Sequence, residues 1–297
     1  SECLVGSEMC IRDSANPDVD VWDFSLGKAA PARTLPKGAI LTLAAAGSEM
    51  SSSCVITNAA TGEKRGYNSS FNRMNFAIEN PVLTYTVNPY QTACGAVDIA
   101  MHTIERYFCP GEDTYLTDSI AEAVIKSTRK AAFDCMKNPD DYTARANMMW
   151  ASSLAHNGLT QCGREFQLVV HQFEHELSGM YPKIAHGAGL AALWCSWARY
   201  VYKANISRWL QYSANVWNLD IDYEHPEKTI EEAINLQEQY YVSLGMPIGL
   251  KALGVEEASL TKLALNCSRN KTRTLTGYKP LAYDDILAIY QMAYERG

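Results

Sequence analysis

Four of the six histidines and one aspartate fall into two short segments whose spacing could bring them to one point. In QTACGAVDIAMHTIERYF, Asp98 and His102 are four residues apart and so lie one turn apart on the same face of a helix. In LVVHQFEHELSGMYPKIAHGAGL, His171 and His175 share this spacing, and His186 follows after a turn containing Gly and Pro. Taken singly, each histidine is better explained as a hydrogen-bonded core or surface residue. Together they predict a site for a divalent ion such as Fe(II) or Zn(II). Because this candidate ligand set contains no cysteine, a catalytic site is favoured over a closed structural one.

Helices must position these residues, because apolar side chains recur every three or four positions after Pro89. Besides the segment 91–108, the pattern predicts helices at 115–136, 142–154, 165–180, 187–202, 207–217, 227–244, 256–267 and 283–295. Two other histidines receive ordinary interpretations: His156 ends a helix and bonds locally, and His225 lies in a loop. Trp194 and Trp197 fall at helical spacing and are expected in the core.

The region before residue 87 reads as a small strand-containing unit. Short apolar or β-branched runs predict strands at 39–44, 54–57 and 76–79. The expected class is therefore α+β, mostly α, with a partial α/β domain at 15–86 and an all-helical metal-binding domain at 87–297. Residues 1–14 (SECLVGSEMCIRDS) lack the features of a signal peptide, and we interpret them as a leader of artefactual origin.

Composition restricts the class of partner. The net charge of -7 argues against a nucleic-acid or anionic membrane surface, since both need clustered Lys and Arg. Nine cysteines without C-x-x-C pairs indicate neither a disulfide framework nor a thiolate zinc site, which favours a reduced, cytoplasmic setting. No stretch is long and apolar enough for a membrane anchor. A small-molecule substrate fits this composition best.

The two histidine segments resemble the signature regions of the iron-containing alcohol dehydrogenases, close to the butanol dehydrogenases, and the resemblance runs from about Asp20 to the C-terminus. That family has a dehydroquinate synthase-like fold and binds its metal through one Asp and three His. The matching positions, and the metal ligands that the resemblance implies, are Asp98, His102, His171 and His186. His175 matches an additional active-site histidine of the family and is expected to transfer a proton.

A third segment resembles the family's T-L-P-A-T-G-S-E motif, which approaches the pyrophosphate of the cofactor. The matching positions in LTLAAAGSEM are Thr42, Gly47 and Ser48, while Ala46 replaces the usual Thr. Without the resemblance, the same stretch would read as a strand-to-helix turn capped by Ser48. Lys64 matches a lysine that meets the cofactor in relatives; by itself it would be a hairpin charge.

The stretch between His175 and His186 is one residue longer than in the family, through Pro182 and Lys183. We expect Gly187 to help absorb the extra residue through unusual backbone dihedrals. The family's glycine-rich phosphate loop should precede Asp20 and is missing from this sequence, so we expect this chain to bind dinucleotide poorly and to be inactive by itself.

The resemblance implies hydride transfer between NADH or NADPH and a short-chain primary alcohol or aldehyde, with iron or zinc as the metal. It also implies pairing into a homodimer. Two alternatives use the same ligands: a metallohydrolase that activates water, and a non-catalytic helical module that holds its metal structurally. A hydrolase has no need of a dinucleotide cradle, so the segment around Gly47 and Ser48 discriminates against it.

Overall fold

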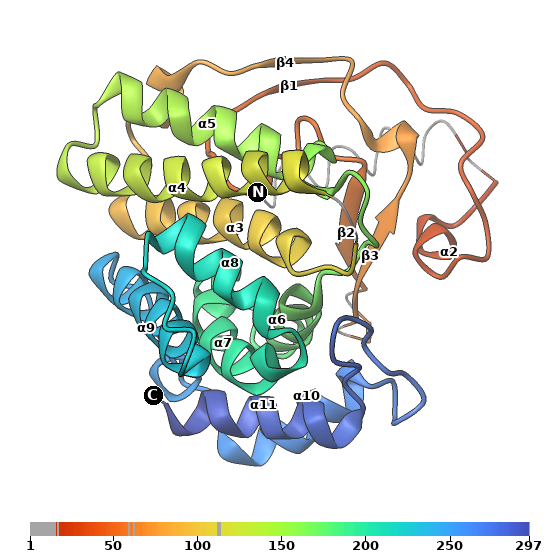
Figure 1. The fold of residues 1–297 in the computed structure, drawn as a ribbon. Coiled ribbons are helices and arrows are strands. Elements are labelled where there is room, and N and C mark those ends of the chain that lie inside the picture. Colours follow the sequence, from red (N-terminus) through yellow and green to blue (C-terminus); the bar gives the residue numbers. More distant parts are fainter. Residues whose placement is uncertain (1–15, 17, 59, 62, 112–113, 297) are drawn as a thin grey trace.

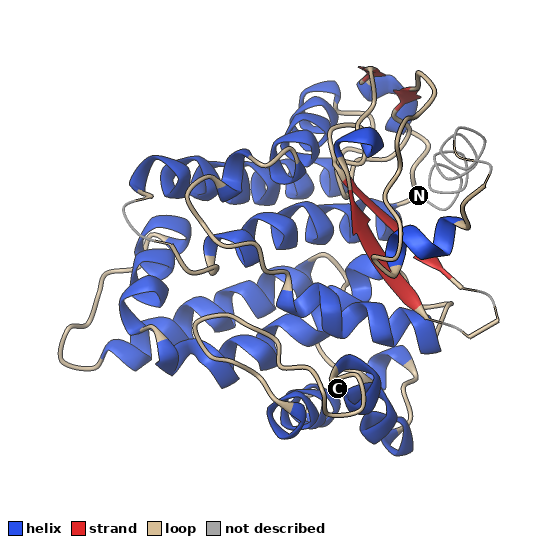
Figure 2. Ribbon diagram, turned by 90° about the vertical axis from the view of Figure 1, so that its right-hand side faces the viewer, coloured by secondary structure: helices blue, strands red, loops and turns tan. Residues whose placement is uncertain are grey.

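The computed structural model describes residue 16 and residues 18–58, 60–61, 63–111 and 114–296. The leader predicted at 1–14 lies outside the described residues. Most of the described chain is helical (Figures 1 and 2). Its α-helices are α2 (Val21–Ser25), α3 (Pro89–Tyr107), α4 (Tyr115–Lys137), α5 (Tyr142–His156), α6 (Val169–Met180), α7 (His186–Val201), α8 (Ile206–Trp217), α9 (Pro226–Ser243), α10 (Leu260–Cys267) and α11 (Tyr283–Glu295).

Four short strands precede α3 and form two separate pairs. β1 (Gly38–Ile40) is parallel to β4 (Phe76–Ile78), and β2 (Ser53–Thr57) is antiparallel to β3 (Lys64–Asn68). The hairpin of β2 and β3 lies at the edge of the helical region in both views (Figures 1 and 2). The mostly helical α+β class is confirmed, while the boundary at residue 87 stays a prediction.

Two strand predictions differ from the structure. The strand expected at 39–44 ends at Ile40, and residues 41–47 form bends that contact α3 and α5. β3 was not predicted, because its sequence, KRGYN, has neither apolar alternation nor β-branched residues. Pairing with β2 rather than intrinsic propensity therefore decides its conformation.

The predicted helices are all present, with shifted ends. α6 begins at Val169 rather than at residue 165, because residues 165–168 are extended. The helix expected at 256–267 is a 3-10 turn, Glu257–Ser259, followed by α10. Trp194 and Trp197 are buried, as expected. Among the described residues, no helix is long and apolar enough to cross a membrane.

α3 is the central helix of the fold. It begins with Pro89 at its first position, and the side chain of Asn88 accepts a hydrogen bond from the backbone N–H of Gln91. Every residue from Thr92 to Tyr107 is buried, and the helix contacts α4, α5 and α7 (Figure 1). The two candidate ligands on α3 are therefore held by packing on all sides.

Gly187 permits the close approach of α7 to α3. It is the second residue of α7, and a Cβ built there would lie 2.2 Å from the carbonyl oxygen of Cys94 on α3. The expected role of Gly187 in absorbing an extra turn residue is thus wrong: its φ is not positive, and its missing side chain serves packing instead. This contact brings His186, the first residue of α7, towards α3.

We predict that Gly187→Ala lowers the free energy of unfolding by about 1–3 kcal/mol, because the added methyl group must push α7 away from the α3 backbone. Urea unfolding followed by circular dichroism measures this effect. Gly66→Ala is the control, since the only atom near its added Cβ is a Val55 methyl at 4.0 Å. Equal stability of the two variants would contradict the role given to Gly187.

Candidate functional site

Asp98 and His102 point from one face of α3 to a common place, as their spacing predicts. His102 Nε2 lies 3.4 Å from Asp98 Oδ1, and both side chains are buried. The i, i+4 spacing places both side chains on one face of the buried helix. One carboxylate oxygen and one imidazole nitrogen are thus available side by side.

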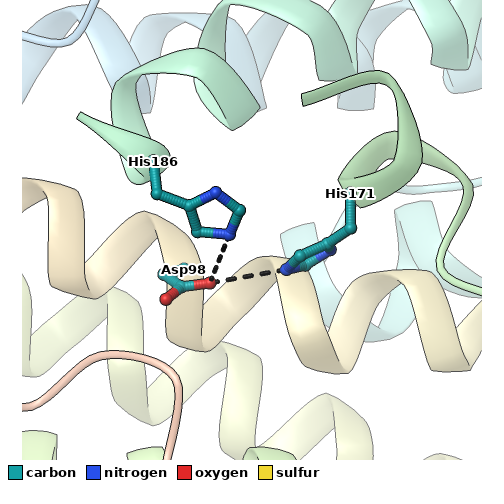
Figure 3. A group of neighbouring side chains, drawn as sticks. All are labelled: Asp98, His171 and His186. Carbon is teal, nitrogen blue, oxygen red and sulfur yellow. Dashed lines mark ion pairs between the residues drawn. The ribbon is translucent and has the colours of Figure 1, made fainter. Parts of the chain in front are cut away.

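Two further imidazoles approach the same carboxylate oxygen from α6 and α7 (Figure 3). The distances to Asp98 Oδ1 are 3.5 Å from His171 Nε2 and 3.7 Å from His186 Nε2. Asp98, His171 and His186 form a set whose ligand atoms all lie within 4.8 Å of one another, and His102 stands beside Asp98 outside that mutual set. Three helices therefore converge on Asp98.

These separations fit a divalent ion. Ligand atoms about 2.1 Å from a tetrahedral ion lie about 3.4 Å from one another, close to the three separations from Asp98 Oδ1. Asp98 Oδ1 and His171 Nε2 are also buried without any hydrogen-bond partner, which is costly for polar atoms unless another group satisfies them. An ion between them would do so. The side chain of His186 is 29% exposed, against 7% or less for the other three, so the site opens on the His186 side.

Two buried glutamates orient the imidazoles on α6 and α7. Glu105 accepts hydrogen bonds from His171 Nδ1 and from the backbone N–H groups of Val170 (2.5 Å) and His171 (3.2 Å). Glu174 accepts a hydrogen bond from His186 Nδ1. These bonds place the proton on Nδ1 and leave each Nε2 free to bind a metal, as carboxylates behind metal-bound histidines commonly do.

Neither glutamate was found from the sequence. Glu105 lies three residues beyond His102 on α3, and Glu174 lies three residues beyond His171 on α6. Helical spacing from the ligands could have nominated both. It could not show that Glu105 serves a histidine on another helix, because that pairing depends on how α3 and α6 pack.

The site shifts the pKa values of its histidines in opposite directions. Burial lowers the pKa of His171, but Glu105 and Asp98 outweigh burial and raise it to about 9. Burial, reinforced by neighbouring imidazoles and Arg106, lowers the pKa of His102 well below its usual value. Burial and Lys64 likewise lower the pKa of His175.

His175 lies next to the converging ligands but faces another part of the site. Its ring centroid is 6.2 Å from that of His171 and 5.7 Å from that of His186. It groups with Glu174 and His186, and among the described residues it forms no ion pair with Asp98. This placement suits a group beside the reacting atoms, and its role in proton transfer stays a prediction.

The candidate cofactor residues before α3 form a turn packed on α5. Gly47 has a φ of 63°, and a Cβ there would lie 2.2 Å from the carbonyl oxygen of Ser152, so only glycine fits. Thr42 is exposed, and Ser48 begins a turn rather than capping a helix. The plain strand-to-helix interpretation is therefore wrong. Glu49 anchors the turn by accepting a hydrogen bond from Ser153 on α5.

Lys64, on β3, reaches α6. Its Nζ donates to Ser178 Oγ at 2.9 Å and lies 3.9 Å from Glu174 Oε2. These contacts bring Lys64 to the side of the site where His175 lies. Lys64 and its hydrogen-bond partner Ser178 are 114 residues apart in the sequence. A role in cofactor binding stays a prediction for Lys64, as it does for Thr42, Gly47 and Ser48.

His156 belongs to this site, although its sequence context predicted only a local hydrogen bond. It ends α5 as expected, but its ring lies 4.2 Å from that of His102, and its Nδ1 is 2.8 Å from Arg106 Nη2 on α3. The prediction of a local bond is wrong, because both partners are about 50 residues away. Only the packing of α5 against α3 reveals the contact.

Residues 92–294 match the profile described as "Fe-containing alcohol dehydrogenase family, C-terminal", and residues 10–81 match the one described as "Iron-containing alcohol dehydrogenase". The chain is 39% identical over 278 residues to NADH-dependent butanol dehydrogenase A of Clostridium acetobutylicum, covering 93% of this chain and 71% of that protein. It is 31% identical over 281 residues to the NADPH-dependent aldehyde reductase YqhD of Escherichia coli, covering 93% and 71%.

A solved structure, NADH-dependent butanol dehydrogenase A from Thermotoga maritima, superposes with a TM-score of 0.91 at 30% identity, covering 98% of this chain and 73% of that one. These relatives are named as dehydrogenases or reductases, so the hydrolase and non-catalytic alternatives find no support among them. Matched in both its strand region and its helical region, the chain belongs to the iron-containing alcohol dehydrogenase family.

Proposed function

We propose that this protein is a metal-dependent alcohol dehydrogenase or aldehyde reductase in which Asp98, His102, His171 and His186 hold the metal. One observation carries the assignment of the site. Three imidazole nitrogens lie 3.4, 3.5 and 3.7 Å from a single buried carboxylate oxygen that has no hydrogen-bond partner. The donor set, one carboxylate and three imidazoles, suits Fe(II) or Zn(II).

A divalent ion in this site would act as a Lewis acid towards the substrate oxygen. The protein's part is to hold the donors and keep them in the right tautomer. Glu105 and Glu174 keep the protons of His171 and His186 on Nδ1, and burial keeps His102 neutral. The exposed side at His186 leaves room for a small alcohol or aldehyde to approach.

The nicotinamide cofactor would lie between the turn at Gly47 and the imidazoles, a usual place for a ligand between two regions of a protein. Hydride would pass between its C4 and the substrate carbon. His175 is the group proposed to give or take the proton of the substrate oxygen, because it lies beside His186 on the more exposed side. Lys64 supplies a positive charge next to it.

The relatives supply the choice of cofactor and substrate. Those named above use NADH in the butanol dehydrogenases and NADPH in the aldehyde reductase, so we propose NADH or NADPH with a short-chain primary alcohol or aldehyde. A homodimer is proposed on the same resemblance, and a cytoplasmic location on the nine cysteines without C-x-x-C pairs.

Metal content tests the proposed site. We expect about one iron or zinc per chain after anaerobic purification, and its loss in His171→Ala, because that substitution removes one donor. His225→Ala is the matched control, since His225 is an exposed imidazole paired with Asp222 away from the site. Elemental analysis measures the metal. Aldehyde-dependent oxidation of NADH or NADPH, assayed on the protein with the family's glycine-rich phosphate loop restored, should fall with the metal in His171→Ala only.

Folded wild-type chain without bound metal would contradict the site. Metal that stays bound in His171→Ala would remove His171 from the ligand set. If the protein with the restored phosphate loop bound metal but oxidised neither NADH nor NADPH across a series of short aldehydes, the proposed activity would be contradicted and the metal site would stay in place.

His175→Ala should slow turnover while metal content stays at the wild-type level, because His175 is proposed to move a proton rather than to bind the ion. Steady-state kinetics of aldehyde reduction and elemental analysis on the same preparation measure both quantities. A general acid or base typically contributes about 100-fold to 10,000-fold in rate, so a large fall in kcat is expected. Loss of metal in this variant would make His175 a ligand instead.

A further inference from the structure

The three candidate imidazole ligands are not oriented in the same way. His171 and His186 each donate Nδ1–H to a buried glutamate. His102 has no such partner, because its Nδ1 is buried without any hydrogen bond. A metal-bound imidazole that lacks an outer hydrogen bond can turn about its side-chain torsions unless something else holds the ring.

Two rings enclose His102 instead. The ring of His171 stacks on the ring of His102, with a centroid distance of 4.2 Å and an interplanar angle of 29°. The ring of His156 is tilted by 51° against the ring of His102, and their centroids are also 4.2 Å apart. His171 is itself a candidate ligand, so it moves with the metal site. His156 comes from α5 and is the contact that does not depend on the metal.

His156 is in turn fixed on two sides. Arg106 Nη2 lies 2.8 Å from His156 Nδ1, and because a guanidinium can only donate, Nδ1 must be the acceptor and the proton must sit on Nε2. Arg106 is buried and is held by the carbonyl oxygen of His102 at 2.7 Å and by Gln161 Oε1 at 3.3 Å. On the other side, the backbone of Gly47 approaches so closely that a Cβ there would lie 3.1 Å from His156 Cβ.

We propose that His156 is a positioning residue for His102: its ring, held by Arg106, serves as the wall that keeps the His102 imidazole turned towards Asp98. This inference rests on the proposed metal site. It assigns to α5 a part in metal binding, although α5 itself contributes no ligand. It also explains why His102 needs no glutamate of its own, since ring packing replaces the missing hydrogen bond.

Three substitutions of His156 separate the effect of its ring from the effect of its hydrogen bond with Arg106. His156→Ala removes both, His156→Phe keeps a ring against His102, and His156→Gln keeps an acceptor for Arg106 without a ring. Leu154→Ala is the control, because Leu154 is partly buried on the same helix and packs on the core. The full chain is stripped of metal, and Co2+ is used as the probe. Competition with a chelator gives its dissociation constant, and visible absorption reports its coordination geometry.

We expect His156→Ala and His156→Gln to weaken Co2+ binding by about 10-fold to 100-fold, as loss of an outer partner commonly does, and to change the Co2+ absorption spectrum. His156→Phe should recover most of the affinity and the wild-type spectrum, and Leu154→Ala should retain both. If His156→Ala does not fold, the Co2+ affinities and spectra of His156→Phe and His156→Gln test the proposal by themselves.

Wild-type affinity and spectrum in both His156→Ala and His156→Gln would overturn the proposal while leaving the metal site intact. Better recovery by Gln than by Phe would also overturn it, since the acceptor for Arg106 would then matter and the ring would not. Failure of the wild-type chain itself to bind Co2+ would overturn the metal site and the role of His156 together.

Discussion

The structure depends on compensating one buried negative charge. Asp98 sits within a fully packed helix and turns a carboxylate oxygen without a hydrogen bond towards three imidazoles. Burying a carboxylate without a partner costs several kcal/mol. Glu105 and Glu174 add two negative charges behind the imidazoles, while Arg106 and Lys64 contribute two positive ones close by. Once His171 has lost its Nε2 proton to bind an ion, one negative charge is left over, so a divalent cation leaves the site at about +1, which favours negative charge developing on a substrate oxygen.

The local sequence pattern was enough to predict which site residues lie together where both residues belong to one helix. Asp98 and His102 could be paired from their four-residue spacing alone, because a helix leaves little choice about which face they share. The helical region was predicted for the same reason. The errors lie mainly at the helix ends, where the predicted ranges include residues that are not helical, such as 165–168. Their types and spacing grouped His171 and His186 with Asp98 in one predicted metal site, but only the resemblance to a family selected which of the histidines bind the ion. Their convergence arises from the packing of α7 against α3 and of α6 against α7.

Contacts between distant segments could not be predicted from the pattern. His156 looked like a helix end because the sequence around it contains nothing that marks a partner 50 residues away. β3 is polar and becomes a strand only through pairing with β2. Gly187 looked like a flexible turn residue, yet it lies in a helix and is glycine because the backbone of another helix passes 2.2 Å from where a Cβ would be. In each case the residue's role is determined by a neighbour in space that lies far away in the sequence.

The burial of α3 from Thr92 to Tyr107 has a consequence for how such a protein can change. Every side chain from Thr92 to Tyr107 packs against a neighbour, so a substitution on this helix opens a cavity or forces overpacking, whichever face it occupies. The helix that carries Asp98 and His102 is therefore closed to gradual adaptation. New substrate preferences must arise in the surrounding elements, such as the connection from α6 to α7, residues 181–185, which are less tightly enclosed. The same separation makes that connection the natural target for directed evolution, with α3 left unchanged.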